Sequence, residues 1–209
     1  MLRIKVCGMN HPENIREIAA LEPEFLGLIF YSGSPRNALR LHTSALREIG
    51  PATRLTGVFV NETPYNIRKT AARYGITTLQ LHGQESPAAC EALEQDGFTV
   101  IKAFPVGSLQ DLKAISPYEG CCSYTLLDTR TDVPGGSGQT FDWSLLEAYD
   151  VSLPFFLSGG ISPGSLSALK EIHHPRLYAV DLNSRFEISP GIKSPELLST
   201  FIRGLRSKQ

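Results

Sequence analysis

Five side chains that can move protons or attack a substrate stand at the ends of short apolar runs in this 209-residue chain. They are Cys7, His82, Asp128, Ser158 and Asp181. Each apolar run has the length and pattern of a buried strand. A strand end that served stability alone could carry any polar residue. A thiol, an imidazole, a hydroxyl and two carboxyl groups at such ends therefore favour a catalytic site.

The strands that position these residues recur at a nearly constant interval, 22 to 30 residues from one strand end to the next. Eight segments are predicted to be strands: residues 2–7, 25–30, 54–60, 78–82, 99–104, 123–128, 154–158 and 177–181. Eight amphipathic segments are predicted to be helices: residues 12–21, 43–49, 64–74, 86–95, 109–115, 143–148, 163–171 and 194–205. Strands that alternate with helices at this interval pair in parallel through right-handed crossovers.

Eight such units predict an α/β protein folded as a single (β/α)8 TIM barrel that spans residues 1–209. No linker, composition shift or low-complexity tract divides the chain. A doubly wound open sheet is the alternative fold. Against it, the turn after the first strand reads CGMNH (residues 7–11) rather than GxGxxG. In a barrel of this kind the active site lies on the loops at the carboxyl ends of the strands.

Two of these loops, after the second and sixth strands, are longer than the others and rich in Gly, Ser, Pro and Arg. Long loops in a compact domain are often binding loops or lids, and the alternative is a plain surface connection. The sequence after the last two strands points to phosphate. SGGISP (residues 158–163) joins a strand to a helix start, and DLNSR (residues 181–185) ends the eighth strand. Loops after strands seven and eight form the recurrent phosphate site of such barrels, where glycines let the backbone approach a ligand.

Strand alternation places Arg3, Lys5 and Cys7 on one face of the first strand, since side chains repeat every two residues. A lysine one layer below a cysteine inside a barrel would be poorly solvated and would need a carboxylate partner. We therefore expect Lys5 to bond an acidic strand end and to favour the thiolate of Cys7. A lysine that points outward would contradict this hypothesis.

Composition excludes several function classes. The formal net charge is −1, so the chain lacks the basic excess that binding to nucleic acid or an anionic membrane requires. Hydrophobic residues make up 42% of the chain, enough to bury a core. No apolar run approaches the roughly 20 residues needed to span a bilayer. Four cysteines without a CxxC pair favour reduced thiols, no metal site and a cytoplasmic location.

Taken together, the motifs closely resemble one family, the phosphoribosylanthranilate isomerases of tryptophan biosynthesis. The matching segments run from the first strand to the last helix, so the resemblance covers essentially the whole chain. They are IKVCGM (4–9), GLIFY (27–31) with SPR (34–36), GVFVN (57–61), LQLHG (79–83), LLDT (126–129), GGSG (135–138) with FDW (141–143), LSGGI (157–161), and VDLNS (180–184) with PGIK (190–193). Any one motif could arise by chance, but the ordered set is specific.

The resemblance implies an Amadori rearrangement of an N-(5-phosphoribosyl)anthranilate to 1-(2-carboxyphenylamino)-1-deoxyribulose 5-phosphate, without a cofactor. By motif position Cys7 is the general base and Asp128 the general acid. The chemistry fits these roles. The ring oxygen leaves only when it is protonated, and a carboxylic acid can donate that proton if its surroundings raise its pKa above about 3.9. Ring opening gives a protonated imine, which makes the proton on C2 more acidic. A thiol is mostly protonated at neutral pH, so Cys7 needs a positive neighbour or activation by the substrate.

The resemblance also implies binding roles. Arg36 is expected to hold the anthranilate carboxylate, since a guanidinium offers a flat pair of donors. The phosphate is expected on Gly159, Gly160, Asn183 and Ser184, with Gly136 closing over it. Gln80 and His82 are expected to line the pocket, with a structural role as the alternative. Asp181 is expected either to steer ribose hydroxyls or to pair with Lys5.

One position departs from the family pattern, because Arg185 stands where many members carry glycine. We expect it to face solvent, and the alternative is that it adds a positive charge near the phosphate. Two other functions remain open. One is the related histidine-pathway isomerase, which carries an aspartate where Cys7 stands here. The other is an inert barrel that only binds a phosphorylated ligand. The expected partner is a small phosphorylated substrate, and the chain is expected to be a monomer or a homodimer.

Overall fold

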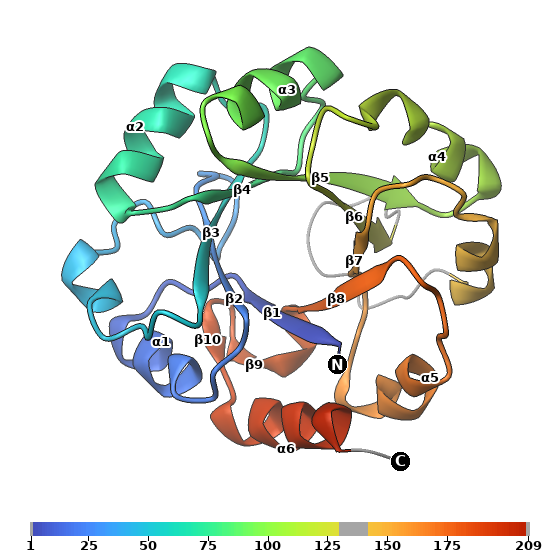
Figure 1. Ribbon diagram of the computed structural model, residues 1–209. Helices are drawn as coiled ribbons and strands as arrows, with labels where there is room; N and C mark the ends of the chain where they lie inside the picture. The colour runs from blue at the N-terminus through green and yellow to red at the C-terminus, as the bar shows by residue number, and fades with distance from the viewer. Residues whose placement is uncertain (1, 130–141, 208–209) are drawn as a thin grey trace.

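Eight parallel strands close into a barrel in the computed structural model, which describes residues 2–129 and 142–207. The strands are β1 (Arg3–Cys7), β2 (Phe25–Ile29), β3 (Arg54–Phe59), β4 (Thr78–Leu81), β5 (Thr99–Val106), β6 (Tyr124–Thr129), β7 (Phe155–Leu157) and β8 (Leu177–Leu182). Each strand pairs with its neighbours in chain order, and β1 closes the ring on β8. Figure 1 shows this ring surrounded by helices, which confirms the predicted fold class.

Six α-helices and five short 3₁₀ turns make up the helical structure of the described residues. The α-helices are α1 (Pro12–Ala19), α2 (Pro64–Tyr74), α3 (Pro87–Gln95), α4 (Leu109–Lys113), α5 (Leu166–Lys170) and α6 (Pro195–Arg206). The 3₁₀ turns are η1 (Thr43–Leu46), η2 (Ser116–Tyr118), η3 (Trp143–Ala148), η4 (Pro163–Ser165) and η5 (Ser184–Phe186). Helices α2 and α3 begin as capping chemistry requires, with Thr63 and Ser86 accepting from the amides of Asn66 and Ala89.

The helices predicted at residues 43–49 and 143–148 are 3₁₀ helices rather than α-helices, over Thr43–Leu46 and Trp143–Ala148. After Leu46 the chain continues in turns, with the amides of Arg47 and Ile49 donating to the carbonyls of Ser44 and Leu46.

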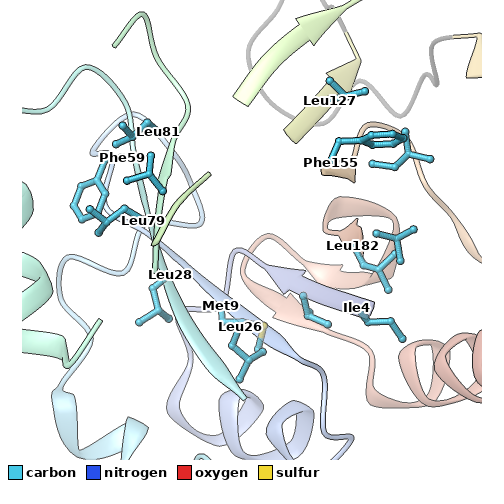
Figure 2. Close-up of a cluster of buried hydrophobic side chains, with 14 of the residues drawn as sticks. Ile4, Met9, Leu26, Leu28, Phe59, Leu79, Leu81, Leu127, Phe155 and Leu182 are labelled. Atoms are coloured by element: carbon cyan, nitrogen blue, oxygen red, sulfur yellow. The ribbon is translucent and has the colours of Figure 1, made fainter. Parts of the chain in front are cut away.

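The core has two parts. Side chains on the outer face of the barrel, such as Ile4, Leu26 and Leu182, pack towards the helices and are fully buried. Figure 2 shows this cluster, with labelled side chains on seven of the eight strands. A second cluster lies among the inward-facing positions, where Phe25 and Phe156 pack edge to face at 5.2 Å. Apolar side chains therefore fill one part of the barrel interior, and the polar strand ends gather at the other.

A small hairpin after β8 is absent from the predicted strands. It pairs β9 (Glu187–Ser189) with β10 (Ile192–Lys193) in antiparallel fashion. Asn14 of α1 fixes it by accepting from the amide of Lys193 at 2.7 Å and donating to its carbonyl at 2.9 Å. In Figure 1 the hairpin lies beside β1 and α6. Within the described ranges, every helix is too short or too polar to cross a membrane.

Candidate active site

A cavity of about 590 Å³ opens at the carboxyl ends of the strands. Eight of the site residues predicted from the sequence line it: Arg36, His82, Asp128, Gly159, Gly160, Asp181, Asn183 and Ser184. Further lining comes from the loop after β2, including Tyr31 and Ser34, and from Asn61 after β3. Gly136 lies outside the described residues. The loops of β2, β3, β4, β6, β7 and β8 thus converge on one space large enough for a sugar phosphate carrying an aromatic ring.

Asp128 faces His82 across this cavity wall. The Nε2 atom of His82 lies 3.3 Å from Oδ2 of Asp128, and both side chains are about one-third exposed. Gln80, buried behind His82, donates from Nε2 to Nδ1 of the imidazole at 2.8 Å. An imidazole whose Nδ1 accepts carries its proton on Nε2, the atom that faces the carboxyl group. The other oxygen of Asp128 accepts from the amide of Thr129 at 3.0 Å.

Lys5 and Asp181 form a buried ion pair in the barrel interior. Their Nζ and Oδ1 atoms are 2.9 Å apart, with side-chain exposures of 0% and 5%. Burial, the largest single effect, lowers the pKa of Lys5, but the charges and hydrogen bonds of Asp181 and Cys7 together outweigh it and the pKa is raised. The expectation that Lys5 bonds an acidic strand end is therefore confirmed, and Asp181 is that residue.

Cys7 lies at the end of β1, two residues beyond Lys5, and is 3% exposed. It is not among the residues that line the cavity. Burial raises the pKa of its thiol, and Lys5, by its charge and hydrogen bonding, opposes the rise without cancelling it. Lys5 thus acts in the expected direction, but burial dominates and the thiol is protonated at neutral pH.

Gly27 makes room for the sulfur atom. It is the register partner of Cys7 in β2, and a Cβ placed on it would lie 2.7 Å from Sγ. Atoms cannot approach that closely without one of them moving. A residue with a side chain at position 27 would therefore displace the thiol.

Arg36 lines the cavity from the loop after β2, but its guanidinium is already held by Glu187 of β9. Nε lies 2.9 and 3.0 Å from the two carboxylate oxygens of Glu187, and Nη2 lies 2.8 Å from Oε2. The Arg36 side chain is 13% exposed. The sequence predicted the position of Arg36 at the site but not this partner.

The residues expected to bind phosphate lie together after β7 and β8. Gly159 and Gly160 have φ values of 84° and 66°, which glycine adopts without strain. A Cβ at Gly159 would also overlap Thr129 of β6. Asn183 and Ser184 line the same cavity. Arg185 is exposed, as expected.

Sequence reasoning missed four buried charged side chains beside the site, those of Glu85, Lys102, Glu187 and Lys193. Glu187 and Lys193 come from the hairpin, and Lys102 of β5 bonds the carbonyls of Leu81 and Gly83 while pairing with Glu85 at 3.2 Å. Lys102 thereby fixes the backbone on both sides of His82. The usable signal was a lone lysine inside an apolar strand, as at Lys5. Within residues 2–129 and 142–207 no three His, Cys, Asp or Glu side chains are grouped to hold a metal ion.

Replacing Lys5 by methionine is expected to lower the free energy of unfolding by about 3–5 kcal/mol, because it leaves the buried Asp181 carboxylate without its partner. Urea denaturation of the purified variant measures this loss. The double variant Lys5→Met/Asp181→Leu removes both charges and is expected to recover most of it. Equal stability of the single variant and the unaltered chain would contradict the pairing.

Comparison with known proteins places this geometry in one family. A family model described as N-(5'-phosphoribosyl)anthranilate (PRA) isomerase matches residues 4–204. The curated N-(5'-phosphoribosyl)anthranilate isomerase of Parabacteroides distasonis is 45% identical over 204 residues, which cover 96% of this chain and 91% of the relative. The isomerase of Phocaeicola vulgatus is 43% identical over 206 residues and covers 98% of both chains.

Solved structures agree with the sequence comparison. The phosphoribosyl anthranilate isomerase of Thermotoga maritima superimposes with a TM-score of 0.84 at 32% identity over 99% of both chains. Another solved isomerase, in complex with reduced 1-(o-carboxyphenylamino)-1-deoxyribulose 5-phosphate, has a TM-score of 0.83 at 30% identity over 99% of both chains. The family model, the curated relatives and the barrel geometry agree, and the chain belongs to the N-(5'-phosphoribosyl)anthranilate isomerase family.

Proposed function

We propose that Cys7 and Asp128 are the general base and general acid of the family's reaction in this chain, the isomerisation of N-(5'-phosphoribosyl)anthranilate in tryptophan biosynthesis. As a member of the family, the chain is an isomerase that acts on a small phosphorylated substrate. One observation carries the assignment of roles. Asp128, Arg36 and the glycine-rich loop after β7 line a single cavity. Cys7 is the last residue of β1, and Lys5 of the same strand bonds Asp181, which lines that cavity.

Ring opening is the first step. Asp128 donates a proton to the ribose ring oxygen as the bond from C1 to that oxygen breaks, and a protonated imine forms between C1 and the amine. The accessible side of the carboxyl group is fixed by two contacts, the amide of Thr129 at Oδ1 and His82 near Oδ2. Orientation of this kind supplies part of the catalysis, because the proton is held where the leaving oxygen lies.

Proton removal from C2 is the second step. The thiolate of Cys7 takes the C2 proton, the electron pair moves to neutralise the imine nitrogen, and an enolamine results. This enolamine then tautomerises to the ketone. This step requires the thiolate of Cys7, and the Lys5 ammonium favours that form by its charge and hydrogen bonding, against the larger effect of burial. Lys5 is thus the positive neighbour that a cysteine base requires.

The two anionic groups of the substrate are proposed to bind to different residues of the cavity lining. Arg36 would hold the anthranilate carboxylate. Gly159, Gly160, Asn183 and Ser184 would hold the phosphate with backbone and side-chain donors. His82 and Gln80 are proposed to act on Asp128 rather than directly on the substrate, since Gln80 lies behind the imidazole.

Replacing Arg36 by methionine is expected to raise KM by about 10- to 100-fold with a much smaller change in kcat. The reason is that a hydrogen-bonded ion pair to a carboxylate that does not react contributes about 1.5–3 kcal/mol equally to the ground and transition states. Steady-state kinetics on the purified variant measure both constants. An unchanged KM would place the carboxylate elsewhere.

Product identification tests the reaction itself. Purified enzyme is incubated with N-(5'-phosphoribosyl)anthranilate, and carbon NMR follows the appearance of the C2 ketone. A parallel incubation with an aminoimidazole ribonucleotide substrate separates this reaction from the same rearrangement in histidine biosynthesis. We expect turnover of the first substrate. Turnover of the second alone would overturn the proposal.

We further propose that the enzyme works in the cytoplasm as a monomer or a homodimer. All four cysteines, Cys7, Cys90, Cys121 and Cys122, are free thiols, which suits a reducing compartment. Light scattering of the eluted enzyme distinguishes the two assembly states.

A further inference from the structure

Glu187 is a buried carboxylate with no role in the reaction as derived so far. It belongs to β9, and its side chain is 5% exposed. Three contacts between 2.8 and 3.0 Å join it to Nε and Nη2 of Arg36. A two-pronged contact of this type fixes the plane of a guanidinium as well as its position.

Glu187 is itself held on its other side. Its Oε1 accepts from Nζ of Lys193 at 2.6 Å and from the amide of Gly191 at 3.1 Å. Burial raises the pKa of the Glu187 carboxyl, but Arg36 and Lys193 outweigh burial and the pKa lies below its usual range. Glu187 is therefore a fixed negative charge. Lys193, fully buried, is anchored in turn to Asn183 at 2.7 Å.

The count of donors on Arg36 shows what this arrangement leaves free. A guanidinium has five N–H groups, one on Nε and two on each Nη atom. Glu187 uses the Nε side and one hydrogen of Nη2. Among the described residues no hydrogen bond to Nη1 is found. The edge formed by Nη1 and Nη2 therefore keeps a parallel pair of donors, and Arg36 lines the cavity.

We propose that Glu187 is a positioning residue for Arg36. It holds the Nε–Nη2 side of the guanidinium, so that the Nη1–Nη2 edge is presented to the anthranilate carboxylate. Glu187 does not touch the substrate, and its effect passes through Arg36. This inference rests on the proposed role of Arg36 in carboxylate binding.

A purely structural role is the alternative. In that case Glu187 would only fasten the hairpin of β9 and β10 to the loop after β2, and its loss would disturb all substrates equally. A positioning role concerns one end of the ligand. The two differ for a substrate that lacks the carboxylate, N-(5'-phosphoribosyl)aniline.

The test compares Glu187→Gln with the unaltered enzyme on both substrates. The glutamine keeps an acceptor for Lys193 but turns an amide NH₂ towards Arg36. We expect KM for the carboxylated substrate to rise about tenfold or more, since a charge-assisted pair of bonds is lost. We expect kcat to change little and KM for the aniline substrate to stay the same. Equal rises for both substrates, or no rise, would overturn the proposal.

Three further variants make the result interpretable. Glu187→Asp keeps the charge beside Lys193 but withdraws from Arg36, and it is expected to show the same selective rise in KM. Asp96→Asn breaks a comparable pair with Arg68, 2.6 Å long and away from the cavity, and is expected to change nothing. Arg36→Met tests carboxylate binding by Arg36 separately from the positioning role of Glu187. If it fails to discriminate between the substrates, the proposed function of Arg36 is wrong, whereas discrimination by Arg36→Met alone rejects only the role of Glu187.

A measurement on the unaltered enzyme does not depend on any Glu187 variant folding. The NMR signal of the Arg36 Nε–H group, assigned with Arg36→Lys, is followed while a reduced product analogue is added. We expect this signal to stay in place, since Glu187 retains that side of the guanidinium when the ligand carboxylate binds the other edge. A large shift would show that the ligand displaces Glu187, and would overturn the proposal.

Discussion

The Asp128→Asn variant is expected to lose about 10²- to 10⁴-fold in kcat/KM, the range that a positioned general acid contributes. Asparagine has nearly the same shape and retains an oxygen for the amide of Thr129. It has no acidic proton to give to the ribose ring oxygen, so ring opening slows. Steady-state kinetics measure the loss, and binding of a reduced product analogue is expected to change far less.

Asp96→Asn provides the matched control for this substitution. It makes the same change of acid to amide at an exposed position, and its activity is expected to equal that of the unaltered enzyme. Turnover of Asp128→Asn close to that of the control would refute Asp128 as the acid. Binding that falls in parallel with turnover would instead indicate that Asp128 serves the ground-state complex.

The Cys7→Ala variant is expected to lose a similar 10²- to 10⁴-fold, mainly in kcat, because alanine has no group that can take the C2 proton. The substitution removes a single buried atom beside Gly27, so the cavity wall is preserved and the product analogue should still bind. Cys90→Ala removes an equally buried thiol from α3 and is expected to leave turnover intact. Equal turnover in the Cys7→Ala variant and the unaltered enzyme would exclude Cys7 from the mechanism.

The ionisation of Cys7 can be measured directly. The difference in ultraviolet thiolate absorbance between the unaltered enzyme and Cys7→Ala isolates this one group. Because burial raises the pKa of Cys7 more than Lys5 lowers it, the midpoint is expected above the ordinary value of about 8.5. A thiolate already formed at pH 7 would mean that Lys5 outweighs burial.

The barrel could be predicted from the sequence because its signal is periodic. The eight strand ends recur at a nearly constant interval, and that interval reflects one strand and its return crossover. The partnership of Lys5 with an acidic strand end followed from the same logic. A lysine inside an apolar strand needs a carboxylate partner. Side chains alternate between the two faces of a strand, so Lys5 shares the inner face with Cys7.

The hairpin of β9 and β10 was not predictable in this way. Its strands have three and two residues, too few for an alternating pattern. Charged residues are seldom buried unless they are paired, and Arg36, the partner of Glu187, lies 151 residues away along the chain. The close contact between Cys7 and Gly27 was also beyond the sequence, because it depends on the register between β1 and β2.

The buried lysine of the hairpin joins two parts of the site. Lys193 bonds both Asn183, at the proposed phosphate end, and Glu187, which grips Arg36. Lys193 therefore links the loop after β8, proposed to bind the phosphate, to the carboxylate that holds Arg36. Loss of this one ammonium group would loosen both contacts together.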